Sequence, residues 1–199
     1  MLSYESKFYK QGYTLIAGID EVGRGPLAGP VVAAAVIMPQ NLQITGVTDS
    51  KAVSGKNRII LADKIKDAAI AWALGWVDQT VIDEINILQA TYAAMTQALS
   101  NLQVVPDAVL IDGVQGKYHP GILCEFIIKG DKLSHSIAAA SILAKVARDA
   151  FMQEEHKKYP HYGFDTNKGY GTPKHKAALQ IHGPCPLHRH SFAKGMYSC

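Results

Sequence analysis

Short apolar runs bounded by turn residues predict a series of β-strands, most of them in the first two thirds of the chain. Runs of this length, rich in valine, isoleucine and alanine, are typical of buried strands. They cover residues 15–20, 30–38, 71–77, 107–112 and 121–128. A glycine-rich loop separates the first two runs. We therefore expect these two strands to be joined through that loop.

Apolar residues on a helical spacing predict helices between and after these strands. The predicted helices cover residues 56–70, 85–102, 133–157 and 173–181. The helix at 133–157 has the strongest signal, because Ser134 is a suitable N-cap and alanines run through it. A helix surface made of such small side chains can lie close against a sheet. Strands with helices interspersed predict a mixed α/β sheet.

A change in composition near Tyr159 predicts a second, smaller unit. Proline, glycine and histidine become frequent there, and the segment after His156 holds seven Lys or Arg residues and a single acid, Asp165. We expect a catalytic domain over residues 1–157 and a basic appendage over 158–199 packed on it. Basic residues mixed with tyrosines can hold a polyanion through phosphate contacts and stacking, although charge alone also fits an ordinary solvated surface.

Composition places the chain among globular proteins. Its 199 residues are 48% hydrophobic and 19% charged, with a formal net charge of +3, which allows a real core and excludes a disordered chain. No run has the length of a membrane span and the N-terminus does not resemble a signal peptide. Three scattered cysteines give no disulfide framework. The expected compartment is the cytoplasm.

Four acidic residues lie at predicted strand ends or helix starts. Asp20 and Glu21 follow the first apolar run, Asp112 ends a later one, and Asp131 precedes the long helix. Such positions can converge on one edge of an open α/β sheet. Carboxylates gathered there would repel one another without a cation, and hard oxygen ligands suit Mg²⁺ or Mn²⁺.

The adjacency of Asp20 and Glu21 raises a geometric difficulty. Neighbouring residues of a strand point to opposite faces of the sheet. The two side chains can share a site only if the strand ends or bulges there, or if one residue contributes its main-chain carbonyl. The glycines that follow favour a strand end.

Two other interpretations compete for these motifs. Gly23, Gly25 and Ala28 satisfy a relaxed dinucleotide-binding fingerprint with Asp49 downstream, but Pro30 would then fall inside the required helix. The residues His182, Cys185, His188 and His190 are of zinc-ligand types, but their spacing is not standard and two prolines interrupt them.

Six motifs together resemble the ribonuclease HII family, the bacterial type 2 ribonucleases H, from Gly18 almost to the C-terminus. The first motif begins within twenty residues of Met1, which favours type 2 over type 3 enzymes. The motifs are GIDEVGRGPLAGPV from Gly18, TDSK from Thr48, IDG from Ile111, KGD from Lys129 with the following SIAAASILAKVARD, NKGYGT from Asn167, and HRxSF from His188. The resemblance implies an α/β fold of ribonuclease H type, with a mixed five-stranded sheet flanked by helices and a small helical basic C-terminal appendage.

The resemblance also implies roles for individual residues. The family's catalytic, metal-binding acids fall on the four acids named above, and a tyrosine that stacks on the sugar at an RNA–DNA junction falls on Tyr170. The remaining implied substrate contacts are the ribose-reading Gly23, Arg24 and Gly25, the phosphate-contacting Lys51, Ser136 and Ser141, and the tail residue Arg189.

The implied activity is a metal-dependent endoribonuclease acting on RNA–DNA hybrids and on ribonucleotides in duplex DNA, with a role in ribonucleotide removal. Two Mg²⁺ or Mn²⁺ ions would support cleavage on the 5′ side of the ribonucleotide, giving 3′-hydroxyl and 5′-phosphate ends. Alternatives are another nuclease of the superfamily such as a junction resolvase, a catalytically silent nucleic-acid-binding module, and a dinucleotide oxidoreductase. We expect a monomer without a membrane association, and no protein partner is evident.

Overall fold

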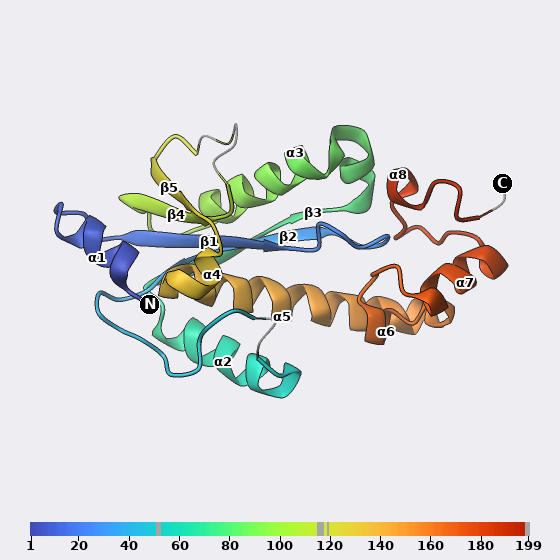
Figure 1. The fold of residues 1–199 in the computed structure, drawn as a ribbon, viewed down its shortest axis with the longest axis horizontal. Helices are drawn as coiled ribbons and strands as arrows, with labels where there is room; N and C mark the ends of the chain where they lie inside the picture. The colour runs from blue at the N-terminus through green and yellow to red at the C-terminus, as the bar shows by residue number, and fades with distance from the viewer. Residues whose placement is uncertain (51–52, 115–117, 119, 198–199) are drawn as a thin grey trace.

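A mixed five-stranded sheet forms the centre of the protein (Figure 1). The computed structural model describes residues 1–50, 53–114, 118 and 120–197. The strand order is β3-β2-β1-β4-β5. β1 pairs antiparallel with β2 and parallel with β4; β2 and β3 are antiparallel, and β4 and β5 are parallel. The expected mixed α/β sheet is confirmed. Its strands are β1 (Ile16–Val22), β2 (Val31–Ile37), β3 (Ala71–Val77), β4 (Ala108–Asp112) and β5 (Leu123–Ile127).

The strand predictions hold with two differences. β1 does not end at Asp20 but continues to Val22, because its pairing with β2 runs without a break to Val22 and Val32. β5 was expected to be buried, yet it is an edge strand and Leu123 is 48% exposed. A continuous apolar run does not distinguish an edge strand from a central one.

Helices cover both faces of the sheet (Figure 1). Helix α3 packs on β2 and β3 on one face, whereas α5 packs on β1 and β2 on the other, with α2 beside it. The helices are α1 (Ser3–Tyr9), α2 (Gly55–Ala68), α3 (Gln79–Ser100), α4 (Gly130–Leu133), α5 (His135–Lys158), α6 (Phe164–Asn167), α7 (Pro173–His182) and α8 (His190–Ala193), together with the 3₁₀ helix η1 (Pro160–Tyr162). Among the described helices, none combines the length and the apolar character needed to cross a membrane.

Helix α3 begins six residues before the predicted start at residue 85. The Asp78 carboxylate caps it by accepting hydrogen bonds from the N–H groups of Thr80 and Val81. Asn86 then interrupts the helix with a positive φ of 69°. This kink rotates the apolar face, so a single helical spacing fits only the second part.

Helix α5 agrees with its prediction, including its N-cap. The Ser134 hydroxyl accepts a hydrogen bond from the N–H of Ile137. The helix lies so close to β1 that a Cβ built on Gly18 would meet the carbonyl carbon of Ser136 at 2.1 Å. The small residues of the two elements therefore permit this contact. Helix α1, which the sequence did not predict, supplies the buried Glu5, whose carboxylate accepts from the Ser134 hydroxyl and the Ser136 N–H.

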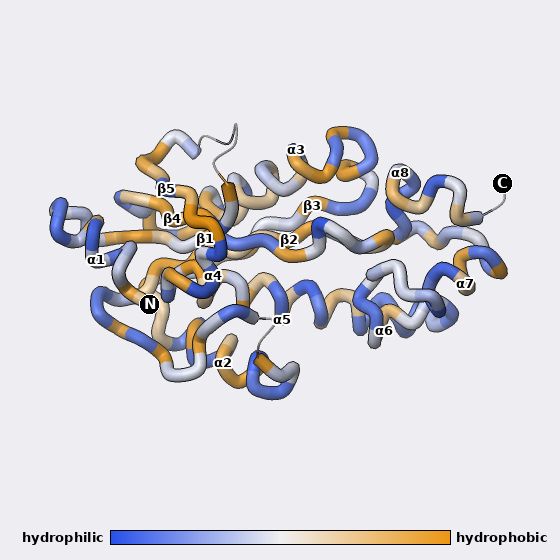
Figure 2. Tube along the Cα trace, in the orientation of Figure 1, coloured by the Kyte–Doolittle hydropathy of each residue, from blue (hydrophilic) through white to orange (hydrophobic). Residues whose placement is uncertain are grey.

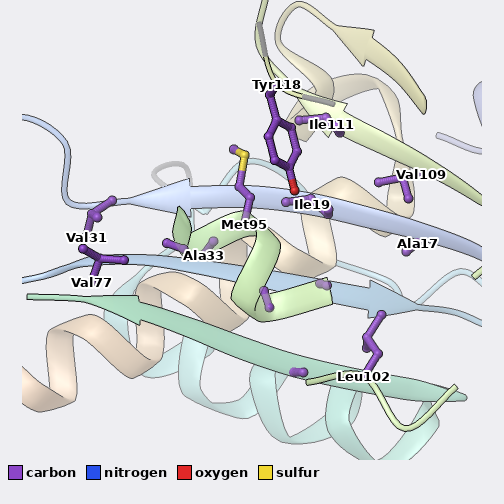
Figure 3. Close-up of a cluster of buried hydrophobic side chains, with 14 of the residues drawn as sticks. Ala17, Ile19, Val31, Ala33, Val77, Met95, Leu102, Val109, Ile111 and Tyr118 are labelled. Atoms are coloured by element: carbon purple, nitrogen blue, oxygen red, sulfur yellow. The ribbon is translucent and has the colours of Figure 1, made fainter. Parts of the chain in front are cut away.

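Apolar residues gather on the sheet and on the faces of the helices that cover it (Figure 2). The largest cluster lies between the sheet and α3, where side chains of β1, β2 and β4 meet Met95 and Tyr118 (Figure 3). A second cluster lies between the sheet, α2 and α5. The sheet is thus buried on both faces, and its strand ends are fixed by packing.

The segment after α5 folds as short helices at one end of the sheet, next to the β1–β2 connection (Figure 1). Its own small core, built around Tyr162 and Phe164, also includes Leu27 and Ala28 of that connection and Met152 of α5. Helix α7 confirms the predicted helix near residue 173. The tail therefore packs directly on the loop that follows the first two acids.

Candidate active site

The four predicted acids line one cavity of about 340 Å³. Asp20 and Glu21 come from β1, Asp112 is the last residue of β4, and Asp131 is in α4. The parallel register pairs Ile19 with Ile111, which places Asp20 beside Asp112. The predicted convergence at one edge of the sheet is therefore observed. Ser50, Ser141, Lys145, Val22 and Tyr170 complete the lining.

The end of β4, not the end of β1, allows Asp20 and Glu21 to share this cavity. Asp20 lies on the face of β1 that carries α5, and Glu21 also lines a second cavity toward α3, together with Asp112. The pairing of β1 with β4 stops at Ile19 and Ile111. Beyond that point β1 has a free edge, where two side chains from opposite faces reach the same space. Neither the expected strand end nor the expected bulge of β1 is observed.

The acidic cluster raises the affinity of its members for protons. Burial raises the pKa of Asp20 well above its usual range, and the neighbouring Glu21 and Asp112 add to this effect. Hydrogen bonds from the Ser141 hydroxyl and the Glu21 N–H oppose it only in part. Burial also raises the pKa of Glu21, against the charge of Arg24 at 3.4 Å. Negative charge is therefore crowded here without full compensation.

The turn that carries Asp131 is hydrogen-bonded to Asp112. An Asp112 carboxylate oxygen accepts a hydrogen bond of 2.6 Å from the N–H of Gly130. A Cβ on Gly130 would lie 2.6 Å from the Ile137 side chain. The KGD sequence thus needs its glycine, because only a residue without a side chain brings this N–H to Asp112.

The donor set fits a divalent cation. Carboxylate oxygens are the ligands that Mg²⁺ and Mn²⁺ prefer, and a cation would relieve the repulsion that, after burial, raises the pKa of Asp20. In the part of the chain that the structure describes, no three His, Cys, Asp or Glu side chains already stand grouped as metal ligands.

Tyr170 lines this cavity, and the glycine loop lies against its ring. Tyr170 is 42% exposed, and a Cβ on Gly25 would lie 3.7 Å from its ring. The Arg24 side chain is half exposed. Gly23 has a φ of 95°, and a Cβ there would meet the Pro30 carbonyl at 2.6 Å. The structure thus places the predicted ribose-reading loop, the predicted stacking residue and the carboxylates together.

Arg189 does not face the cavity, in contrast to the expected phosphate contact. Its side chain is fully buried, and its guanidinium donates hydrogen bonds to the carbonyls of Gly23, Arg24 and Gly29. Burial lowers its pKa to about 9, so it remains charged at neutral pH. This arginine holds the glycine loop from within, and a direct substrate contact does not fit its placement.

Arg148 of α5 is a second buried arginine, and sequence reasoning missed it. It donates to the carbonyls of Ala28, Pro30 and Lys168. Burial lowers its pKa to about 10. The two guanidinium groups thus satisfy the carbonyls of the β1–β2 connection from two directions. The sequence signal was only an arginine in an alanine-rich helix, which gives no indication of burial.

The remaining predicted contacts differ in their placement. Ser141 lines the cavity, and its hydroxyl lies within hydrogen-bonding distance, 2.9 Å, of the Ser50 hydroxyl. Ser136 is buried against β1 and is absent from the cavity lining, so a phosphate contact does not fit it. Lys51 lies outside the described residues. Lys145, which was not predicted, lines the cavity one helical turn after Ser141 and pairs with Asp149. The spacing of one helical turn from Ser141 is the sequence signal that could have identified Lys145.

The two competing interpretations are wrong. A strand, β2, follows the glycine loop where a dinucleotide site requires a helix. The zinc-type residues do not converge: His188 bonds to His175, His190 to the Tyr197 hydroxyl, and His182 stacks on His161.

Comparisons with known proteins agree with this arrangement. A family model described as Ribonuclease HII matches residues 17–195. Ribonuclease HII of Oceanobacillus iheyensis is 53% identical over 195 residues, which cover 97% of this chain and 74% of that protein.

Two solved structures share the fold. Ribonuclease H2 from Pyrococcus horikoshii superposes with a TM-score of 0.75 and 26% identity, covering 92% of this chain and 96% of that one. Bst ribonuclease HIII in complex with Mn²⁺ gives a TM-score of 0.67 at 19% identity, covering 88% of this chain and 65% of that one. The second likeness concerns the fold alone.

Proposed function

Because the chain belongs to the ribonuclease HII family, whose members are endoribonucleases, we propose that it cleaves the RNA strand of RNA–DNA hybrids and cuts duplex DNA on the 5′ side of a single embedded ribonucleotide. The observation that carries this proposal is the adjacency of three features: the four-carboxylate cavity, the Gly23–Gly25 backbone and the Tyr170 ring. Chemistry and ribose recognition would thus meet within one site. The cut would leave 3′-hydroxyl and 5′-phosphate ends.

Recognition of the ribose would rest on the backbone of the glycine loop, in which Arg24 and Gly25 are exposed. The 2′-hydroxyl both donates and accepts hydrogen bonds, and it is what distinguishes RNA from DNA at a given position. Glycine main chain can approach it closely because no Cβ intervenes. Such contacts select for a ribose and do not depend on the identity of the base. The Tyr170 ring, packed on the next sugar, favours a deoxyribose there because no 2′-oxygen intrudes.

Cleavage rests on the four carboxylates. Asp20, Glu21, Asp112 and Asp131 would hold two Mg²⁺ or Mn²⁺ ions. When bound, such ions activate water for in-line attack and stabilise the leaving 3′-oxygen. The chain's own part is to hold the carboxylates in place, through the Gly130 N–H on Asp112 and the Ser141 hydroxyl near Asp20. Arg24, which lines the second cavity together with Glu21 and Asp112, would contact a flanking phosphate, a contact that weakens with salt.

The test uses a labelled DNA duplex with one ribonucleotide and, in parallel, the all-DNA duplex and a uniform RNA–DNA hybrid, each with Mg²⁺ or Mn²⁺. We expect one cut 5′ to the ribonucleotide, cleavage of the hybrid, and none of the all-DNA duplex. Cutting of all-DNA junctions irrespective of ribose would point to a resolvase and contradict the proposal.

The matched variant for this test is Asp112→Asn. It should lower cleavage by about 10³-fold, since carboxylate-held ions contribute several kcal/mol, while duplex binding in a gel-shift assay stays close to normal. The control is Asp63→Asn on α2, an exposed acid that pairs with Lys66, which should cleave normally. Normal turnover of the Asp112 variant would refute the assigned chemistry.

A further inference from the structure

A chain of hydrogen bonds runs from the tail to the backbone of Tyr170 through two histidines. The N–H of Cys185 donates to Nδ1 of His188 at 2.9 Å. Nε2 of His188 lies 3.0 Å from Nε2 of His175, and Nδ1 of His175 lies 2.9 Å from the Tyr170 carbonyl oxygen. The two rings therefore link residue 185 to residue 170.

The chemistry of the two ends fixes where the protons lie. The Cys185 N–H can only donate, so Nδ1 of His188 accepts and its proton is on Nε2. Nε2 of His175 then accepts, and its proton is on Nδ1, where the Tyr170 carbonyl accepts it. The reverse arrangement, with His188 donating to the Cys185 carbonyl at 3.2 Å, would set a lone pair of His175 against the Tyr170 oxygen. Only the first arrangement satisfies every group with two neutral rings.

The surroundings keep both rings neutral. His175 and His188 are 0% and 1% exposed, and the rings of Tyr162 and Phe164 pack on them. Burial lowers the pKa of both histidines. The pKa of His188 falls to about 4, because the neighbouring His175 and the more distant His190 add to the effect of burial. In this arrangement a proton added to His175 would place two N–H donors face to face at 3.0 Å, and one added to His188 would set its Nδ1–H against the Cys185 N–H at 2.9 Å.

The same tail segment also holds the glycine loop. Ala28 and His188 form an isolated antiparallel bridge, and Arg189 donates to the carbonyls of Gly23 and Arg24. The Leu27 N–H in turn donates to the Gly169 carbonyl, next to Tyr170. Two consecutive tail residues thus fix the two parts of the site that read neighbouring sugars.

We propose that His175 and His188 are positioning residues that hold Tyr170 at a set distance from the Gly23–Gly25 loop, and thereby determine the preference for an RNA–DNA junction over a uniform hybrid. This inference rests on the proposed function. Neither histidine touches the substrate, and the pair acts through the Tyr170 carbonyl. A loosened tyrosine would weaken recognition of the junction while leaving the carboxylates intact.

The test compares His175→Phe with His175→Asn on two substrates. The phenylalanine keeps the ring shape without hydrogen bonds, whereas the asparagine amide can replace the donor at Nδ1. We expect kcat/KM on the single-ribonucleotide duplex to fall about tenfold in His175→Phe, the equivalent of one hydrogen bond. It should fall about twofold or less on the uniform hybrid, and His175→Asn should recover most of the loss.

A double-mutant cycle with Tyr170→Ala separates positioning from general damage. In that background His175→Phe should change the ratio of the two substrates no further. An unaltered ratio in His175→Phe, an equal loss on both substrates, or an undiminished effect without the Tyr170 ring would overturn the inference. If the wild type fails to cut the junction at all, the proposed function fails instead.

Nitrogen NMR of the wild-type histidines gives a readout that does not depend on variant folding. It should show neutral rings at pH 7, with the proton on Nε2 in His188 and on Nδ1 in His175. The opposite tautomers, or a protonated ring at pH 7, would equally overturn the inference.

Discussion

At the scale of single residues, Asp20 shows the strongest conflict between stability and chemistry. Its carboxyl group is buried beside Glu21 and Asp112, and its pKa is raised for that reason. A raised carboxyl pKa means that the folded state binds the proton more tightly than the unfolded chain. Once the pH rises above the ordinary pKa of an aspartate, the ionised Asp20 carboxylate therefore destabilises the folded state.

Replacing Asp20 by asparagine should stabilise the protein and abolish cleavage. The neutral amide keeps the size of the side chain and removes the buried charge, and each kcal/mol gained raises the melting temperature of a domain this size by about 2 to 4 °C. Thermal unfolding at pH 7.5 without divalent ions measures the gain. Asp63→Asn is the control and should leave the melting temperature unchanged. A lower melting temperature for Asp20→Asn would show that its hydrogen bonds outweigh its charge.

Tyr170 carries a separate prediction, because it lines the cavity without being an acid. Tyr170→Ala should lose cleavage of the single-ribonucleotide duplex by about tenfold to 100-fold, in line with a stacking contribution of about 1 to 3 kcal/mol. General binding to duplex DNA should change much less. Tyr170→Phe keeps the ring and should retain most of the activity. Equal rates for the alanine variant and the wild type on the junction would exclude the stacking role.

At the scale of elements, the β1–β2 connection depends on two buried guanidinium groups. Arg148 and Arg189 together donate to carbonyls from Gly23 to Pro30, and to Lys168. A glycine-rich loop is flexible by itself. These contacts hold one conformation of a segment that must present its backbone to a sugar.

Arg189→Met should therefore lower the free energy of unfolding by about 3 kcal/mol or more, because several buried carbonyls lose their donors. Arg189→Lys should rescue little of this loss, since a single ammonium cannot reproduce the planar fork. Urea unfolding measures both effects. Arg24→Met changes a half-exposed side chain in the same loop and should leave stability within about 0.5 kcal/mol. A stable Arg189→Met variant would contradict the assigned role.

The elements themselves were predictable where one periodicity covered the whole element. β2, β3, α2 and α5 follow their patterns closely. α3 was predicted short because the kink at Asn86 breaks its apolar spacing. β5 was assigned to the interior because an apolar run does not show how many neighbours a strand has. Local patterns thus located the elements, and their environment remained undetermined.

At the scale of the whole molecule, the tail completes the site that the first strands begin. Its core shares Leu27, Ala28 and Met152 with the β1–β2 connection and α5. Two buried histidines lie in this shared core. Their lowered pKa values mean that the unfolded chain binds protons more readily than the native state, so stability falls as the pH falls.

The free energy of unfolding should consequently drop between pH 7 and pH 5. For His188, with a pKa of about 4 in place of 6.5, the stability is fully present above pH 6.5 and is lost as the pH falls toward 4. The loss at pH 5 is about 2 kcal/mol. Urea unfolding should be measured in the Asp20→Asn variant, because the raised pKa of Asp20 acts in the opposite sense.

The control for this pH dependence is His182→Gln in the same background. His182 is exposed and stacks on His161, so its replacement should preserve the decrease. Stability that is equal at pH 7 and pH 5 would show that the buried pair accepts protons without penalty.

The sequence by itself determined the five strands, the longer helices, the four acids and the glycine loop, since periodicity and local motifs depend on neighbours along the chain. Only the tertiary structure decided which groups meet. It showed that β4 ends beside Asp20 and lets Asp20 and Glu21 share a cavity. It also turned Arg189 from an expected phosphate contact into a buried support of the loop. Burial and the pairing of distant segments arise from packing between elements, and no local pattern of residues contains that information.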